Sequence, residues 1–426
     1  MFVHLHVHSP YSFLDGASTI DAYLEKAAEF DMPALALTDH SNVSGAVEFQ
    51  KKALSLGIKP IQGVEIVTED RTHLTLLAEN NRGYTSICKL LTKGYAEGPQ
   101  GECIITWETL AAHHEGLLVL SGCRRSGICQ AILRKDYARA KKEALRLIDI
   151  FGTHQVYLEM IHSFLPRTKQ LLTKIYELHQ ELKIPIAATN NVHYLNKETF
   201  PIHDLLVCTR TRTTLDDIHP ERPLNRENYF TSPQEMLERF RAFPEAIRNT
   251  LEIAERCSPA LNLEQNLFPR YLPDDHGQTA VQLLTDLTWA GAVRRYHRIT
   301  PALRQRIHYE LNIIAQLDVA DYFLVVWDII QYAKKKGIRY AGRGSAADSV
   351  VVYCLEITNV DAFARGLLFE RFLSLERAQK PDIDIDFDAR FRDEIADYVY
   401  KRYGADHVAS VCTFHTYHAR SALRDL

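Results

Sequence analysis

The sequence lacks the features of membrane and secreted proteins. None of its apolar runs reaches the length of about 18 residues that a membrane-spanning helix needs. The eight cysteines form no C-x-x-C pair, which is typical of reduced cytosolic thiols and not of a disulfide framework. The N-terminus, MFVHLHVHSPYS, enters a strand pattern directly and has no signal-peptide pattern. We therefore expect a cytoplasmic protein with no membrane segment.

The sequence also lacks a strong charge imbalance and any low-complexity tract. Its formal net charge is −4 over 426 residues, with 24% charged and 46% hydrophobic residues. This composition is typical of a folded globular protein, and the length predicts two or three domains. The nearly balanced charge counts modestly against a nucleic-acid partner, although a local basic groove is compatible with a neutral total.

Seven short apolar runs in the first 195 residues end in a residue that can bind a metal ion. Each run is typical of a buried parallel strand, and helical periodicity lies between several of them. Strand–helix alternation predicts a parallel sheet closed into a barrel, in which the strand ends converge on one mouth. The runs are FVHLHVH (2–8), PALALTDH (33–40), KPIQGVEI (59–66), HLTLLAE (73–79), GLLVLSGC (116–123), VYLEMIH (156–162) and PIAATNNVH (185–193).

This barrel mouth is a candidate metal site. Imidazole, carboxylate and thiolate ligands together favour zinc, manganese or iron over magnesium, and carboxylate-bridged ions would suit phosphoester hydrolysis. A lone strand-end histidine is more often structural, but seven such signals in order favour a metal site. Glu159 and His162 are equally compatible with supporting a ligand or contacting a substrate. The candidate ligands are His6, His8, Asp15, His40, Glu65, His73, Cys123 and His193.

The chain divides near residue 260. TSPQEMLERF and PEAIRNTLEIAERC predict two helices, and the stretch 258–277, rich in proline, asparagine and aspartate, predicts a linker. Helical patterns then resume in TAVQLLTDLTWAGAVRRY, ALRQRIHYELNIIAQL and DYFLVVWDIIQYAKKKG.

A glycine-containing loop follows these helices. The pattern predicts a strand over 338–341, a tight loop from Gly342 through Arg343 and Gly344 to Ser345, and a helix that starts near Ser345. Glycines let a phosphate approach the backbone, and a helix N-terminus supplies free N–H groups, to which Arg343 would add a charge. A plain surface loop is the alternative interpretation.

The segment KPDIDIDFD (380–388) carries three alternating aspartates. On a strand, Asp382, Asp384 and Asp386 would share one face, where their repulsion is costly unless cations neutralise it. Paired carboxylates that hold two magnesium ions are a standard device for nucleotidyl transfer. An edge strand with a solvated acidic face is the alternative.

These motifs resemble the bacterial C-family DNA polymerases. FVHLHVHSPYSFLDG, ALTDHSNVSGAVEF, GVEI and LSGC resemble the polymerase-and-histidinol-phosphatase (PHP) domain that opens those proteins, and GRGSAADS, FERFLSLER and PDIDIDF resemble the start of their palm. The resemblance implies an α/β fold in which a PHP-type (β/α)7 barrel with trailing helices (1–257) and a linker (258–277) precede an incomplete α+β palm (278–426).

The resemblance also implies roles for individual residues. Asp382 and Asp384 match the catalytic carboxylates and would hold Mg²⁺, and Arg343, Gly344 and Ser345 match the nucleotide-binding loop. The barrel ligands would hold Zn²⁺ or Mn²⁺. The ninth ligand position of the family, normally an aspartate, is Asn191 here, which puts hydrolysis at the barrel in doubt.

The implied function is a DNA-directed DNA polymerase of the alpha-subunit type. Its partners would be primer-template DNA, deoxynucleoside triphosphates, the sliding clamp and other replisome subunits, and Asp348 and Phe391 tilt the resemblance toward the error-prone branch. We expect the third catalytic carboxylate and the clamp-binding region to lie in a later segment, so that this chain alone is inactive as a polymerase. The alternatives are a metal-dependent 3′–5′ exonuclease or phosphoesterase in the barrel, and a non-catalytic metal-binding module.

Overall fold

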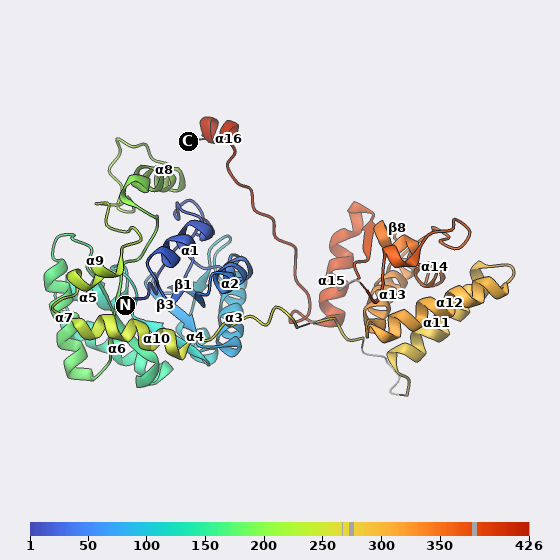
Figure 1. Cartoon of the computed structure of the whole chain (residues 1–426), viewed down its shortest axis with the longest axis horizontal. Helices are drawn as coiled ribbons and strands as arrows, with labels where there is room; N and C mark the ends of the chain where they lie inside the picture. The colour runs from blue at the N-terminus through green and yellow to red at the C-terminus, as the bar shows by residue number, and fades with distance from the viewer. Residues whose placement is uncertain (266, 272–276, 377–380, 426) are drawn as a thin grey trace. The chain divides into compact units, whose positions relative to one another are not determined.

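The computed structural model describes residues 1–265, 267–271, 277–376 and 381–425 (Figure 1). The chain forms two compact units. Unit 1 comprises Met1–Glu264 with Thr416–Leu426, and unit 2 comprises Gln265–His415. The predicted linker falls in part on residues 266 and 272–276, and Lys380 of the predicted acidic strand also lies outside the described residues. The predicted boundaries at 257 and 277 stay a prediction.

Unit 1 alternates strands and helices, and the predicted α/β class is confirmed. Its strands are β1 (Ala34–Leu37), β2 (Lys59–Thr68), β3 (His73–Ala78), β4 (Ile104–Ile105), β5 (Leu117–Leu120), β6 (Val156–Ile161) and β7 (Ile186–Thr189). Its helices are α1 (Ile20–Glu29), α2 (Ala46–Ser55), α3 (Asn81–Glu97), α4 (Trp107–Ala112), α5 (Gly127–Leu133), α6 (Tyr137–Phe151), α7 (Thr168–Leu182), α8 (Phe200–Thr211), α9 (Pro233–Arg239), α10 (Pro244–Arg256) and α16 (Ala419–Asp425).

The strands of unit 1 pair in the order β1-β2-β3-β5-β6-β7, and the short β4 pairs with β2 off this path. The expectation that every run is a parallel strand is wrong for β3, which is antiparallel to both β2 and β5. An apolar run does not encode strand direction. The turn between β2 and β3 holds only residues 69–72, too few for the crossover that two parallel neighbours need.

The first predicted strand is an extended segment that closes the sheet. Residues 2–8 form no named strand, but the amide of Ala36 donates to the carbonyl of His4 at 2.9 Å on one side. On the other side the amide of His8 donates to the carbonyl of Val192 at 2.8 Å, and Val7 bridges Val192 in the parallel sense. The segment therefore joins β1 to the residues after β7 and completes the barrel.

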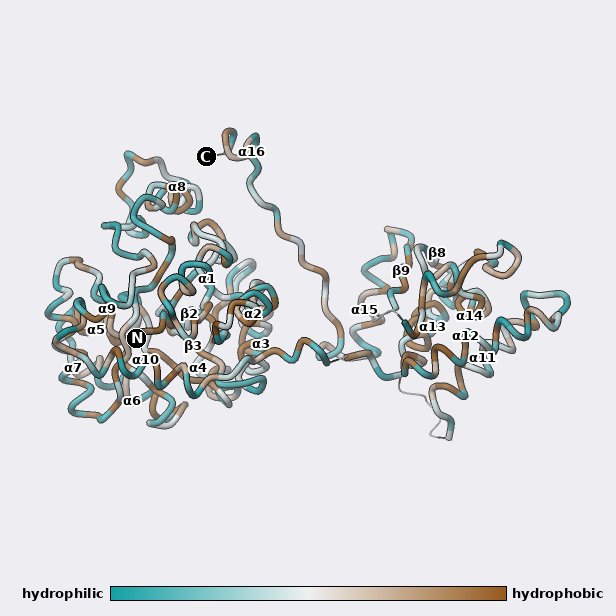
Figure 2. The backbone as a smooth tube through the Cα atoms, viewed as in Figure 1, coloured by the Kyte–Doolittle hydropathy of each residue, from teal (hydrophilic) through white to brown (hydrophobic). Residues whose placement is uncertain are grey.

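Apolar side chains fill the barrel and the layer between the barrel and its helices. In Figure 2 the tube around β2 and β3 is brown, the colour of hydrophobic residues. The residues of β1, β3, β5 and β7 are all buried. Helix α10 packs against β7 and buries Ala246, Ile247 and Ile253. The predicted helix around TSPQEMLERF is confirmed as α9, which Ser232 and Glu235 start with a reciprocal capping box.

Unit 2 is mostly helical and holds one small sheet. Its strands are β8 (Tyr340–Arg343) and β9 (Asp384–Phe387), which pair in the antiparallel sense. Its helices are α11 (Ala280–Arg295), α12 (Pro301–Gln316), α13 (Ala320–Lys335), α14 (Val350–Cys354) and α15 (Arg392–Tyr403). The helices predicted in TAVQLLTDLTWAGAVRRY, ALRQRIHYELNIIAQL and DYFLVVWDIIQYAKKKG are confirmed as α11, α12 and α13. None of the helices among the described residues is both long and apolar enough to span a membrane.

Candidate metal centre and palm site

The barrel brings the predicted ligands together at one edge of the sheet. His40 follows β1, Cys123 follows β5, and Asn191 and His193 follow β7. His73 is the first residue of its strand, not the last. Because β3 runs antiparallel to its neighbours, its beginning lies at the same edge as the ends of the parallel strands.

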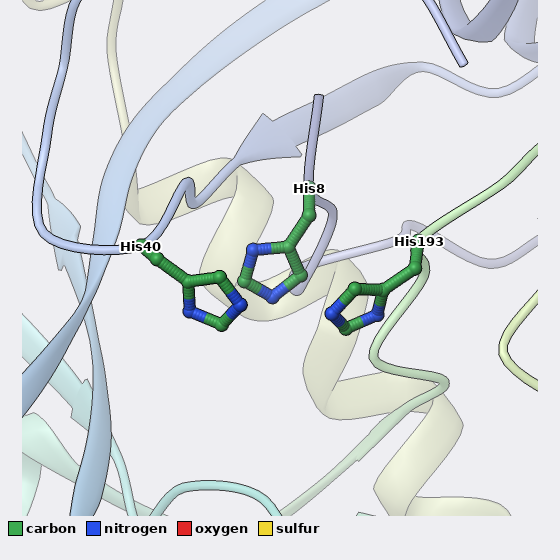
Figure 3. A group of neighbouring side chains, drawn as sticks. All are labelled: His8, His40 and His193. Carbon is green, nitrogen blue, oxygen red and sulfur yellow. The ribbon is translucent and has the colours of Figure 1, made fainter. Parts of the chain in front are cut away.

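His8, His40 and His193 form one of the groups with metal-binding geometry. Figure 3 shows the His8 ring between the other two rings. The ring centroids lie 4.1 Å apart for His8 and His40 and 4.3 Å apart for His8 and His193. His8 and His193 are buried, and three imidazoles packed in this way offer nitrogen ligands on one side of a common space.

Glu65 belongs to both other groups with metal-binding geometry, one with His6 and His8 and the other with His73 and Cys123. Its Oε2 atom lies 2.8 Å from Nδ1 of His40, 3.6 Å from Nε2 of His8 and 3.7 Å from Nε2 of His6. Its Oε1 atom lies 2.7 Å from Nδ1 of His73, and that nitrogen lies 3.6 Å from Sγ of Cys123. One carboxylate therefore contacts both ends of the cluster, as a carboxylate that bridges two metal ions would.

One buried atom at this centre fits metal ligation better than hydrogen bonding. Nε2 of His6 is fully buried and has no hydrogen-bond partner among the described residues, and the buried Oε2 of Glu65 faces nitrogen atoms of three histidines. Two ligands about 2.1 Å from one tetrahedral ion lie about 3.4 Å apart, close to the observed separations of 3.6 and 3.7 Å. The donor set of imidazole, carboxylate and thiolate therefore suits a transition-metal ion.

Asp15 and Asn191 complete the predicted set. Oδ2 of Asp15 lies 3.2 Å from Nε2 of His40, and its Oδ1 lies 3.8 Å from Nε2 of His193. Oδ1 of Asn191 lies 3.1 Å from Nε2 of His8. Asn191 adopts a left-handed backbone conformation with φ of 44°. All nine residues predicted to form the metal site thus lie in one connected cluster.

Charge in the cluster is divided between protonated and neutral histidines. Burial disfavours the imidazolium at His6 and His40, but the adjacent carboxylates raise the pKa to about 9 at His6 and about 10 at His40. Burial lowers the pKa of His8, and at His193 burial lowers it to about 3. His8 and His193 are therefore neutral at pH 7, the state in which imidazole binds a metal.

Several residues outside the predicted ligand set hold these ligands in place. Glu159 accepts a hydrogen bond from Nδ1 of His6 at 2.7 Å, which turns the Nε2 of His6 toward Glu65. Ser12 lies 3.0 Å from Nδ1 of His8 and donates to Asp39 at 2.7 Å. The contact of Glu159 with His6 joins residues 153 positions apart, and the strand-end position of Glu159 is the signal that predicted a supporting role for it. Ser12 is only four positions from His8, but nothing in the sequence pattern marked it.

Unit 2 places the predicted nucleotide loop beside the predicted catalytic carboxylates. Arg343 lies opposite Asp384 in the β8–β9 pair. Its Nη1 atom donates to Asp384 at 2.9 Å and its Nε atom to Asp386 at 3.0 Å. Gly344 has φ of +69°, and a Cβ atom there would lie 3.3 Å from Oδ2 of Asp384. Asp382 lies just before β9.

The expected helix start near Ser345 is wrong. Ser345 lies in a 3-10 turn, Gly344–Asp348, and α14 begins only at Val350. The amides of Val350 and Val351 donate to the buried carboxylate of Glu310 at 3.1 and 3.0 Å. These N–H groups are therefore already satisfied by the protein, and the helix N-terminus is not free to bind a phosphate.

Glu310 also receives hydrogen bonds from two side chains. Ser349 donates to it at 2.7 Å and Arg306 at 2.6 Å, and Arg306 also donates to the carbonyls of Asp348 and Leu367. This network ties α12 to the far end of the nucleotide loop. The phosphate contacts predicted for Arg343, Gly344 and Ser345 therefore cannot be supplemented by the amides of Val350 and Val351.

Two family models match the chain. Residues 4–163 match the PHP domain, and residues 282–426 match the bacterial DNA polymerase III alpha NTPase domain. The chain is 53% identical, over all of its length, to an error-prone DNA polymerase of Symbiobacterium thermophilum and 37% identical to a DNA polymerase III subunit alpha of Borreliella burgdorferi. It spans 40% and 38% of the length of these relatives.

A solved structure resembles part of the chain more distantly. It is a two-domain protein from Bacteroides vulgatus described as PHP-like, with 12% identity and a TM-score of 0.30, and the match covers 60% of this chain and 70% of that one.

Proposed function

We propose that the chain belongs to the family of bacterial DNA polymerase III alpha subunits and error-prone DNA polymerases, and that it provides the PHP domain and part of the palm of such an enzyme. The reaction is the addition of deoxynucleotides to the 3′ end of a primer. We place the PHP barrel with its trailing helices at 1–257, the linker at 258–277 and the palm segment at 278–426. The higher identity to the error-prone relative favours that branch.

The proximity of Gly344 to Asp384 carries this proposal. A Cβ atom on Gly344 would lie only 3.3 Å from the Asp384 carboxylate, so this backbone is close enough to bring a bound phosphate next to the acidic pair. Asp382 and Asp384 would hold Mg²⁺, which neutralises phosphate charge and activates the primer hydroxyl during nucleotidyl transfer. The guanidinium of Arg343 lies against the Asp384 carboxylate. This contact supports the proposal that this carboxylate takes a positively charged partner.

Each residue of the loop has a distinct part in this proposal. Gly344 lets the triphosphate approach the backbone, because a side chain there would be strained at φ of +69° and would crowd Asp384. Ser345 supplies a hydroxyl donor, and Arg343 can exchange a carboxylate for a phosphate, since a guanidinium binds both with the same paired geometry.

The partners follow from the same proposal. Primer-template DNA and deoxynucleoside triphosphates bind at the palm, in the cytoplasm. The sliding clamp and other replisome subunits bind through segments that correspond to the remaining length of the relatives.

A chimera tests the polymerase proposal. The chain replaces the matched part of the Symbiobacterium thermophilum error-prone DNA polymerase, and extension of a labelled primer by the purified protein is measured with Mg²⁺. We expect extension by the chimera and its loss on Asp384→Asn. Asp393→Asn, which removes a charge from an exposed residue nearby, is the matched control and should retain extension. Extension that survives Asp384→Asn would contradict the assignment of this carboxylate.

The barrel supports a second candidate function. The connected cluster of nine residues would hold Zn²⁺ or Mn²⁺ and would suit a metal-dependent phosphoesterase or 3′–5′ exonuclease. Asn191 argues against it, because an amide is an uncharged and poorer ligand than a carboxylate. A barrel whose metal only stabilises the fold is the remaining alternative.

Degradation of a 3′-labelled DNA strand separates these alternatives. The purified chain is assayed with manganese or zinc beside the His6→Ala/His8→Ala double variant. Cleavage by the chain that disappears in the variant identifies the barrel as a nuclease. An intact strand, together with metal retained by the chain and lost by the variant, assigns the metal a structural role.

A further inference from the structure

A tyrosine at the start of α13 contacts the backbone between the two candidate catalytic aspartates of unit 2. Tyr322 is the third residue of α13, and the backbone amide of Ile383 donates a hydrogen bond to its hydroxyl at 3.2 Å. Ile383 stands between Asp382 and Asp384 in the chain. The contact joins residues 61 positions apart, so it depends on the fold of unit 2 and not on the local sequence.

Ile383 is held on two sides. Its side chain is only 8% exposed and belongs to the hydrophobic core of unit 2. Strand β9 begins one residue later, at Asp384, which pairs with Arg343 of β8. The amide of Ile383 therefore lies just before the paired strand, and the Tyr322 hydroxyl is its hydrogen-bond partner.

The backbone at Ile383 determines where both carboxylates point. Pro381 and Ile383 are buried, whereas Asp382 between them is exposed and Asp384 is half-buried. This alternation is typical of an extended chain, in which residues two apart lie on the same face. A rotation of the backbone at Ile383 would therefore turn the two carboxylates away from their common face.

Tyr322 is itself held in place by its surroundings. Its ring packs against the core of unit 2, and its centroid lies 5.6 Å from that of the Phe268 ring. The preceding residue, Asp321, accepts a hydrogen bond from the amide of Tyr271 at 2.8 Å and pairs with Arg270 at 3.1 Å. These contacts tie the first turn of α13 to the segment before α11, so the hydroxyl has a fixed place.

The Tyr322 phenol remains neutral at pH 7. Burial raises its pKa, and the charges of Asp382 and Asp384 raise it as well, whereas the hydrogen bond from Ile383 lowers it. A neutral hydroxyl holds the backbone without adding negative charge beside the two carboxylates.

We propose that Tyr322 is a positioning residue of the palm, whose hydroxyl fixes the backbone at Ile383 so that Asp382 and Asp384 face the same Mg²⁺. The inference rests on the proposed function, in which these two carboxylates hold Mg²⁺. Because Tyr322 acts on them through the backbone of Ile383, its loss should weaken Mg²⁺ binding more than it slows the reaction once Mg²⁺ is bound. A tyrosine that only stabilises the fold is the alternative.

Two variants of the same helix provide a matched comparison. Tyr322→Phe removes the hydroxyl that holds Ile383 and keeps the ring that packs in the core. Tyr332→Phe is the control, because it removes the same group from a residue of α13 whose hydroxyl donates to Glu394 at 3.1 Å. Both variants therefore lose one side-chain hydrogen bond, but only Tyr322→Phe loses a contact with the acidic strand.

Hydrogen exchange of the full chain tests the contact itself, measured by mass spectrometry at single-residue resolution. The Ile383 amide should exchange about fivefold faster in Tyr322→Phe, since the loss of one hydrogen bond changes an equilibrium constant by roughly this factor. In Tyr332→Phe its exchange should be unchanged. The amides of α12 are the internal reference. Unchanged exchange of Ile383 in Tyr322→Phe, or an equal acceleration throughout α12, would overturn the proposal.

The Mg²⁺ dependence of primer extension by the chimera tests the consequence for the palm. In Tyr322→Phe we expect the half-saturating Mg²⁺ concentration to rise about fivefold, with the rate at saturating Mg²⁺ changed by less than about twofold. Both quantities should be unchanged in Tyr332→Phe. An unchanged Mg²⁺ requirement in Tyr322→Phe, or a low rate that excess Mg²⁺ does not restore, would contradict a positioning role.

Failure of this inference and failure of the proposed function give different results. If the unsubstituted chimera does not extend a primer, or if extension survives Asp384→Asn, the proposed function fails and the role of Tyr322 toward Mg²⁺ falls with it. If the unsubstituted chimera extends the primer and Tyr322→Phe behaves like Tyr332→Phe, only the positioning role of Tyr322 is wrong.

Discussion

Arg343 donates from Nη1 to the Asp384 carboxylate at 2.9 Å and stands directly opposite this residue in the β8–β9 pair. Ala341, two residues earlier, stands opposite Asp386. Because Ala341 is small, the Arg343 side chain can also reach diagonally to Asp386, where its Nε atom donates at 3.0 Å. One guanidinium therefore neutralises two of the three alternating aspartates.

Replacing Arg343 should change the affinity of unit 2 for divalent cations. In Arg343→Gln the two carboxylates lose their positive partner, so a cation no longer competes with a guanidinium for them. An exposed ion pair contributes up to about 1 kcal/mol, so we expect Mn²⁺ to bind up to about fivefold more tightly. Titration followed by electron paramagnetic resonance measures this, with the barrel site filled with zinc beforehand. In the Arg343→Gln/Asp384→Asn variant the gain should disappear, and a gain that persists would place the cation elsewhere.

Removal of the Glu310 carboxylate should destabilise unit 2. In Glu310→Ala the amides of Val350 and Val351 and the Arg306 guanidinium lose a buried partner, which we expect to lower the free energy of unfolding by about 3 kcal/mol. Urea unfolding, followed by tryptophan fluorescence, measures the loss. Gln305→Ala, at an exposed position of the same helix, should change stability by less than about 0.5 kcal/mol. Equal stabilities of the two variants would refute the role of Glu310.

Chelation of bound metal should lower the melting temperature of unit 1. A metal present at about 1,000 times its dissociation constant adds about 4 kcal/mol, which corresponds to about 10 °C for a unit of this size. Differential scanning calorimetry with and without chelator measures the shift, and the transition of unit 2 should stay in place. The His6→Ala/His8→Ala variant should melt at the same temperature in both conditions. An unchanged transition in the unsubstituted chain would show that its barrel folds without metal.

Asn191→Asp should strengthen metal binding at the barrel. The substitution places a charged oxygen where Oδ1 now lies 3.1 Å from Nε2 of His8, and aspartate tolerates the left-handed backbone of this position. We expect zinc affinity to rise about tenfold, a typical effect of one changed group at a metal site. Competition with a chromogenic chelator measures it. Asn196→Asp adds the same charge at an exposed helix cap and should leave zinc affinity unchanged.

The cluster could be predicted from sequence because its ligands are local to the strand ends. His40, Cys123 and His193 each follow an apolar run, and parallel strands bring such positions to one edge. The antiparallel direction of β3 could not be predicted, because an apolar run is the same in both directions. His73 nevertheless lies with the other candidate ligands, because the reversed direction of its strand brings its first residue to the edge where the parallel strands end.

The contacts that orient the site depend on tertiary structure. Glu159 meets His6 across 153 residues, and no local pattern encodes that pairing. In unit 2, glycines and a serine favoured a helix that starts at the nucleotide loop, but the buried carboxylate of Glu310 satisfies amides five residues farther along. Glu310, which is distant in sequence, therefore stabilises the first turn of α14. Neither helix propensity nor the loop sequence predicts this contact.

The closure of the barrel by its first residues has a consequence for synthesis on the ribosome. Val7 pairs with Val192, so the extended segment that carries His6 and His8 has no neighbour on one side until nearly 200 residues have been made. At about 5–20 residues per second, this interval lasts from about 10 to 40 seconds. One pairing edge of this segment stays open throughout that time, and the group of His8, His40 and His193 is complete only once His193 has emerged.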